Sequence, residues 1–143
     1  MFKQFRLLAL AAAVLFAVAG TAFAQVTDEE PTVTFVLTTG LGAYEQGAFA
    51  FLGTEGELEG VDNPDLVVKV GDVVRVVLIS GDAMRHDFRI DDLGVATEYT
   101  ASQGDEVSVT FVVTEAGEFE YYCSEPGHQL GGMYGRFIVE AAE

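Results

Sequence analysis

The sequence predicts an all-β fold, a β-sandwich of antiparallel strands joined by Greek-key connections. From residue 32 onward, short runs of β-branched and aromatic residues alternate with Gly, Asp, Asn and Pro, the pattern of strands separated by turns. No segment keeps a helical period over three turns. Strands this short at this spacing are typical of two packed sheets that each bury one face.

The predicted strands follow one another to the end of the chain. Residues 106–113 alternate most clearly, with Val107, Val109, Phe111 and Val113 on one face. The other predicted strands, in chain order, are 32–39, a candidate short strand at 48–52, 66–70, 73–79, 85–90, 117–123 and 134–140. The loop between the last two strands then lies at one end of the sandwich, where a rigid scaffold commonly carries its functional residues.

The first 24 residues have the parts of a secretory signal peptide. Lys3 and Arg6 form a positive start, residues 7–19 are an uninterrupted apolar run, and the triplet AFA at 22–24 is a small-x-small cleavage site. The run is shorter than the roughly 20 apolar residues that a membrane span needs. We therefore expect residues 1–24 to be removed and the mature protein to be soluble in the periplasm or another extracytoplasmic space. An uncleaved N-terminal anchor is the alternative.

Residues 25–143 are enough for a single domain with a hydrophobic core and too few for two. The formal net charge of −16 becomes −18 when Lys3 and Arg6 are removed. Such an acidic surface repels nucleic acid and anionic lipid, and it favours a basic docking surface on a protein partner through an attraction that salt weakens. Solubility or a saline habitat explains the acidity equally well. We expect a monomer.

The stretch YYCSEPGHQLGGM, residues 121–133, contains the only cysteine of the chain. Cys123, His128 and Met133 follow one another at intervals of five residues, and the second histidine of the chain is His86. An exported protein with a single cysteine has a free thiol, an intermolecular disulfide or a metal ligand. A thiolate, two imidazoles and a thioether are the set that forms a trigonal His2Cys copper site with a weak axial methionine. Each residue taken singly is more often a packing residue, but their combination favours copper.

On these residues the chain resembles the cupredoxins, the family of small blue copper proteins. The C-x4-H-x4-M spacing is similar to that of longer-loop members such as auracyanin and rusticyanin. Two blocks, 51–90 and 117–140, resemble cupredoxin domains attached to copper nitrite reductases, so the match covers roughly residues 51–140. The resemblance implies one type 1 copper ion, which cycles between Cu(I) and Cu(II). It also implies that the protein is not an enzyme but shuttles single electrons between a larger redox donor and acceptor.

Carried over position by position, the resemblance implies a role for each residue of the motif. His86, Cys123 and His128 become equatorial ligands and Met133 the axial ligand. Many relatives have asparagine or serine where this chain has Asp87, and that residue usually ties the two ligand segments together, here toward the backbone near Ser124. The residues expected to form an apolar docking rim around a partly exposed His128 edge are Met84, Pro126, Leu130 and Tyr134.

Other classes of site fit the sequence less well. A two-copper centre needs a second cysteine, multicopper catalysis needs further histidines, and zinc has no use for a methionine. A cysteine hydrolase would need Cys123 and a histidine facing each other in an open cleft. The main alternative is a periplasmic copper carrier or buffer, although such proteins tend to use exposed methionine- and histidine-rich sites without a thiolate. A structural sandwich that has lost its metal is a third interpretation.

Overall fold

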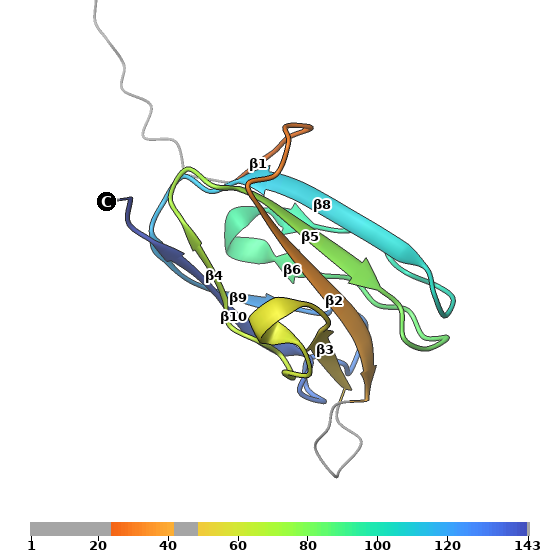
Figure 1. The fold of residues 1–143 in the computed structure, drawn as a ribbon. Helices are drawn as coiled ribbons and strands as arrows, with labels where there is room; N and C mark the ends of the chain where they lie inside the picture. Colours follow the sequence, from red (N-terminus) through yellow and green to blue (C-terminus); the bar gives the residue numbers. More distant parts are fainter. Residues whose placement is uncertain (1–23, 42–48, 143) are drawn as a thin grey trace, which may run out of the picture.

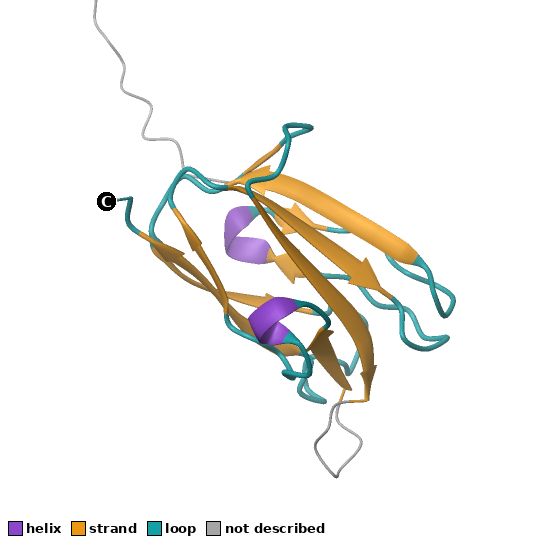
Figure 2. Ribbon diagram, in the orientation of Figure 1, coloured by secondary structure: helices purple, strands orange, loops and turns teal. Residues whose placement is uncertain are grey.

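The computed structural model describes residues 24–41 and 49–142, which form two facing β-sheets (Figures 1 and 2). The predicted all-β sandwich is confirmed. The predicted signal peptide, apart from Ala24, lies outside the described residues. The first sheet has the order β1 (Gln25–Val26), β8 (Glu106–Val112), β5 (Val73–Ile79), β2 (Val33–Leu41) and β3 (Phe49–Gly53). The second has the order β4 (Leu66–Lys69), β10 (Tyr134–Glu140), β9 (Gly117–Tyr122), β6 (Arg89–Ile90) and β7 (Val95–Ala96).

Two strand pairs are parallel, β2 with β5 and β10 with β4, whereas the other pairs among the described strands are antiparallel. Both sheets are therefore mixed, so the prediction of antiparallel strands is wrong for these two pairs. The parallel pairs arise because the chain changes sheets: β2 and β3 form a hairpin in the first sheet, β4 crosses to the second, and β5 returns beside β2. The helical elements η1 (Gly56–Leu58) and η2 (Asp91–Leu93) are short 3-10 segments. Within the described ranges, no helix has the length and apolar character to cross a membrane.

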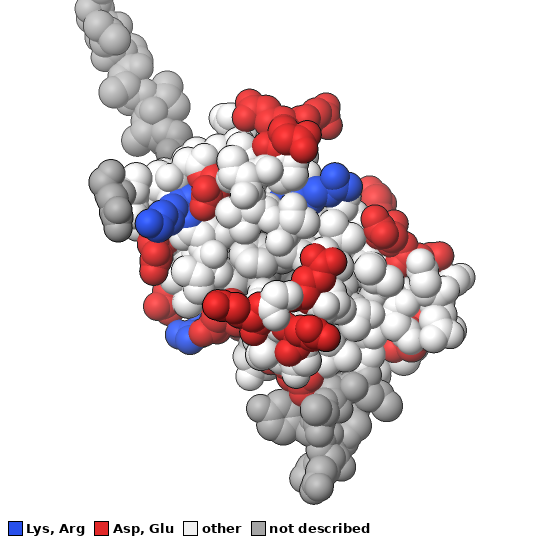
Figure 3. Space-filling view, viewed as in Figure 1, with Lys and Arg blue, Asp and Glu red and all other residues white. Residues whose placement is uncertain are grey.

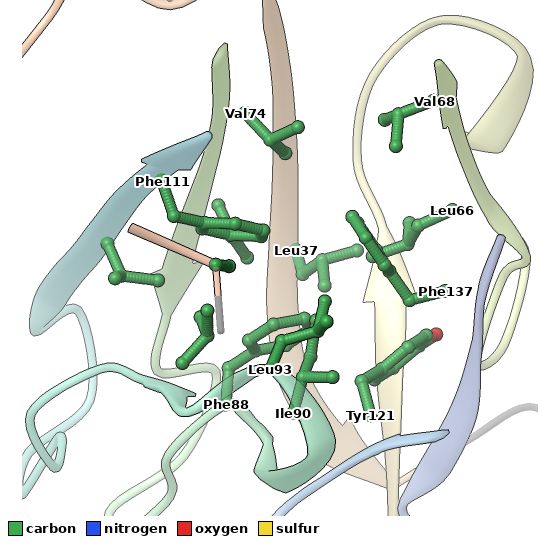
Figure 4. Packing of buried hydrophobic residues seen from close by; sticks show 14 of the residues in the cluster. Leu37, Leu66, Val68, Val74, Phe88, Ile90, Leu93, Phe111, Tyr121 and Phe137 are labelled. Carbon is green, nitrogen blue, oxygen red and sulfur yellow. The ribbon is translucent and has the colours of Figure 1, made fainter. Parts of the chain in front are cut away.

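Aromatic side chains from both sheets fill the space between the layers (Figure 4). Phe51, Phe88 and Tyr121 are fully buried, with ring centroids 5.1–5.8 Å apart. The alternation predicted for residues 106–113 is confirmed, because Val109 and Phe111 are buried in this core. Burying a large apolar side chain contributes about 1.5–3 kcal/mol to stability, so this core holds the two sheets together.

The predicted strand at 85–90 is shorter than expected. Only Arg89 and Ile90 form β6, and His86 lies before it in an isolated bridge to Thr100. The hydroxyls of Thr100 and Thr97 accept hydrogen bonds from the His86 and Phe88 N–H groups, at 3.2 and 3.1 Å. The two threonine hydroxyls replace part of the hydrogen bonding of a β-ladder. The N–H groups of His86 and Phe88 therefore have acceptors although both residues lie outside β6.

Gly135 should be sensitive to substitution because Tyr121 lies opposite it in the pairing of β9 with β10. A Cβ atom at Gly135 would overlap the Tyr121 ring, whose hydroxyl donates a buried 2.7 Å hydrogen bond to the Pro64 carbonyl. We expect Gly135→Ala to lower the free energy of unfolding of the copper-free protein by about 1–3 kcal/mol, measured by chemical denaturation.

The matched control is Gly40→Ala, also in a strand, where the nearest atom would be 4.0 Å from the new Cβ. It should change the stability by less than about 1 kcal/mol. Equal effects of the two substitutions would show that the contact with Tyr121 does not limit position 135.

Candidate metal centre

Three of the predicted ligands meet at one point in the structure. The ligand atoms of His86, Cys123 and His128 all lie within 4.8 Å of one another, and all three residues are buried. The Cys123 sulfur is 4.0 Å from His86 Nδ1 and 3.5 Å from His128 Nδ1. Residues 37 positions apart are thus brought together within the second sheet, because β6, which follows His86, pairs with the end of β9, which precedes Cys123.

These distances fit three ligands around one ion. Bonds of about 2.0–2.3 Å, as imidazole and thiolate form with zinc, place two ligands of a trigonal ion roughly 3.7 Å apart. The observed separations of 3.5 and 4.0 Å lie on either side of that value. Two nitrogens and a sulfur in this arrangement are the equatorial set of a type 1 copper site, so the residues present fit one copper ion.

Asp82 holds the far side of the first histidine. Its Oδ1 atom lies 3.0 Å from His86 Nε2 and also accepts a 2.8 Å hydrogen bond from the Met84 N–H. A carboxylate that accepts the Nε2 proton leaves the Nδ1 lone pair free for a metal and orients the ring. Burial opposes ionisation of Asp82, but its hydrogen bonds with Met84 and His86 and the attraction of the nearby histidines together lower its pKa. Sequence reasoning missed Asp82, because a spacing of four residues in a loop implies no contact.

The buried Asp87 connects the two segments that carry the ligands. Its carboxylate oxygens accept hydrogen bonds from the Ser124 N–H and the Ser124 hydroxyl, both at 2.7 Å. Asp87 follows His86 and Ser124 follows Cys123, so these bonds fix one ligand segment against the other. The Tyr99 hydroxyl lies 2.6 Å from Ser124 Oγ and extends the network to the surface.

Met133 is fully buried at the end of the loop that carries the other ligands, here called the ligand loop (residues 123–133). Its carbonyl accepts a hydrogen bond from the Cys123 N–H at 3.2 Å, and its N–H donates to the His128 carbonyl at 3.0 Å. Gly127 and Gly132 have φ values of 89° and 104°, which side-chain-bearing residues rarely adopt. The loop therefore closes on itself and returns Met133 to the vicinity of Cys123.

The residues predicted to form a docking rim are all exposed, and Leu130 is 96% exposed. The expectation of a partly exposed His128 edge is wrong, because only 3% of His128 is exposed. Phe49 from β3 stacks on its ring, with centroids 4.1 Å apart and planes 23° from parallel. Sequence reasoning could not foresee this contact, since residues 49 and 128 meet only in the tertiary structure.

Burial changes the proton affinities of two ligands. It raises the pKa of the Cys123 thiol to about 11, although the N–H groups of Asp87 and Glu125 oppose this shift. Burial, together with the neighbouring His86, lowers the pKa of His128. At neutral pH the copper-free site therefore holds a protonated thiol beside a neutral imidazole.

Comparisons with known proteins match this chain to a family model and to solved structures of similar fold. The family model for copper-binding proteins of the plastocyanin/azurin family matches residues 62–140. Auracyanin B has a similar structure at 22% identity, with a TM-score of 0.56 over 83% of this chain and 96% of that chain. Rusticyanin from Thiobacillus ferrooxidans is similar at 22% identity, with a TM-score of 0.58 over 84% and 88% of the two chains. Reduced rusticyanin is similar at 20% identity, with a TM-score of 0.56 over 84% of this chain and 90% of that chain.

The thiol at Cys123 makes copper binding depend on pH. Because its pKa is raised to about 11, binding of Cu(II) has to displace the thiol proton, and that proton competes more strongly as the pH falls. We expect the apparent affinity to rise about tenfold per pH unit through the neutral range, measured by competition with a chelator of known affinity at each pH. Cys123→Ser, which has no thiol proton to release, should lose this dependence. An affinity of the wild-type protein that does not change with pH would contradict the protonated thiol.

Proposed function

The chain belongs to the plastocyanin/azurin family of copper-binding proteins, and on that premise we propose that it is an exported carrier of single electrons. The observation that carries the proposal is the buried convergence of His86, Cys123 and His128 within 4.8 Å. When bound there, copper supplies a one-electron couple between Cu(I) and Cu(II).

In this proposal the thioether of Met133 is the fourth, axial ligand. With four protein ligands, no position remains open for a substrate, so the protein is not an enzyme in its own right. The ties from Asp82 to His86 and from Ser124 to Asp87 hold the ligand residues in place. A site that changes little between oxidation states exchanges electrons quickly.

We further propose that redox partners dock on the rim formed by Met84, Pro126, Leu130 and Tyr134. The chain has 23 Asp and Glu residues against 7 Lys and Arg residues, and in Figure 3 acidic side chains form separate patches spread over the visible face. Such a surface attracts a basic docking surface on a donor or acceptor and raises the encounter rate at low salt. Residues 1–24 direct export in this proposal, and the mature domain of residues 25–143 works outside the cytoplasm.

A copper carrier or buffer is the alternative within the same fold. A carrier has to release its metal to another protein, which is easiest from exposed ligands. Here His86 and Cys123 are fully buried and His128 is 3% exposed, and this burial favours retention of the ion. Voltammetry distinguishes the two functions, because an electron carrier cycles reversibly with its copper bound whereas a carrier of copper loses or transfers the ion.

The proposal is tested by titrating the mature domain with one equivalent of Cu(II). We expect an intense visible thiolate-to-copper absorption band, a small copper hyperfine splitting in the EPR spectrum and reversible one-electron voltammetry. Cys123→Ser should abolish the intense band because it removes the sulfur donor, whereas Met84→Leu, at an exposed position, should keep it. A Cys123→Ser variant that remains intensely coloured would show that Cys123 is not the thiolate ligand and would contradict the type 1 copper site.

The axial role of Met133 has a separate test. Met133→Leu should keep copper and colour but raise the reduction potential, because it removes a weak donor that favours Cu(II). The measurement is voltammetry of both proteins at the same pH and ionic strength. An unchanged potential would show that Met133 is not the axial ligand.

A further inference from the structure

The peptide group between Gly132 and Met133 is held by hydrogen bonds at both of its ends. Its carbonyl oxygen, on Gly132, accepts a 2.9 Å hydrogen bond from the side-chain amide of Asn63 and another of 2.9 Å from the Tyr134 N–H. Its N–H, on Met133, donates to the His128 carbonyl at 3.0 Å. The orientation of this peptide determines where the Met133 side chain begins.

Asn63 lies outside the ligand loop, 69 residues before Gly132, and β3 holds it in place. Its backbone N–H donates to the Phe51 carbonyl at 2.6 Å, and its Oδ1 atom accepts a 3.0 Å hydrogen bond from the Phe51 N–H. The Phe51 N–H can only donate and the Gly132 carbonyl can only accept, so the two partners set the orientation of the amide. Asn63 also has a φ of 46°, a left-handed conformation that asparagine tolerates better than most residues.

The same strand contacts the ligand loop a second time. Phe49 stacks on His128 at 4.1 Å. A Cβ atom on Gly131 would lie only 3.1 Å from the Phe49 ring, so strand and loop are in close contact there. Figure 1 shows β3 beside the blue loop at this end of the sandwich. Two independent contacts therefore connect β3 to the second half of the ligand loop.

We propose that Asn63 is a positioning residue for the axial ligand, and that it acts by fixing the Gly132–Met133 peptide to β3. This inference rests on the proposed function in one respect, the axial role of Met133. An axial thioether bond to copper is long and weak, and the axial ligand tunes the reduction potential. A small shift of the Met133 peptide therefore changes the strength of that bond. Because β3 belongs to the sheet opposite β9 and β10, Asn63 adds a support from outside the loop itself.

Two variants separate this role from the role of Asn63 in its own turn. Asn63→Gly keeps the left-handed backbone accessible but removes both side-chain hydrogen bonds. Asn63→Asp keeps an acceptor for the Phe51 N–H but places a carboxylate oxygen against the Gly132 carbonyl in place of the donor. The control is Gln129→Ala, which removes an exposed 2.6 Å hydrogen bond between the ligand loop and Glu120 of β9.

The first measurement uses the copper-free protein. Hydrogen exchange of the Met133 amide, followed by NMR, should become about tenfold faster in Asn63→Gly and Asn63→Asp, the factor expected for one lost hydrogen bond, and should stay unchanged in Gln129→Ala. The second measurement uses the copper-loaded protein, in which both Asn63 variants should alter the EPR rhombicity and the reduction potential relative to the wild type and the control.

The outcomes are distinct. Faster exchange together with an altered EPR spectrum supports the proposal. Unchanged exchange and an unchanged spectrum in Asn63→Asp overturn it and leave the blue copper assignment intact. Faster exchange with an unchanged EPR spectrum and potential also overturns it, because Asn63 would then order the loop without acting on the axial ligand. If the wild-type protein forms no blue site, the proposed function fails, and the proposal that Asn63 positions the axial ligand fails with it. This holds even where the exchange result shows that Asn63 orders the loop.

Discussion

The metal centre depends on one interaction, the pair of hydrogen bonds that the buried Asp87 carboxylate accepts from Ser124. Its two 2.7 Å hydrogen bonds join the segment that carries His86 to the segment that carries Cys123. Hydrogen bonds that a carboxylate accepts are about twice as strong as neutral ones, and here they act where β6 lies beside the end of β9. Without this contact, the pairing of Arg89 with Tyr122 between β6 and β9 and the packing of side chains would have to keep the ligands, 37 residues apart, in register. The remaining supports of the site are arranged around this connection.

The site combines stable packing with a cluster of buried polar groups. A thiol with a raised pKa and two imidazoles are buried against one another, an arrangement that contributes little to the stability of the copper-free protein. A ligand that binds only the folded state stabilises it by mass action, so copper would add the stability that these groups do not supply. Sites at which a chain departs from the simplest stable choice are commonly functional. The aromatic core around Tyr121 supplies the stability that such a site requires.

The two sheets make unequal contributions to the centre. In the second sheet, Cys123 follows β9 directly. Strand β3 of the first sheet carries no ligand, but it contacts the ligand loop through Phe49. It also holds Asn63 through Phe51, and Asn63 in turn binds the loop. His128 is consequently covered rather than exposed. The ligand loop thus exposes side chains such as Leu130, whereas its imidazole is covered.

The sequence by itself determined most of the strands, the candidate ligand types and their spacing within residues 123–133. Alternation in 106–113 and the intervals between Cys123, His128 and Met133 are local properties, and local backbone geometry is enough to interpret them. The tertiary structure alone decided that His86 leaves its predicted strand, that Asp82 holds its ring and that Phe49 covers His128. These features depend on threonine hydroxyls, loop conformation and contacts between residues far apart in the chain. No periodicity in the sequence encodes such contacts, because they form only when the two sheets pack.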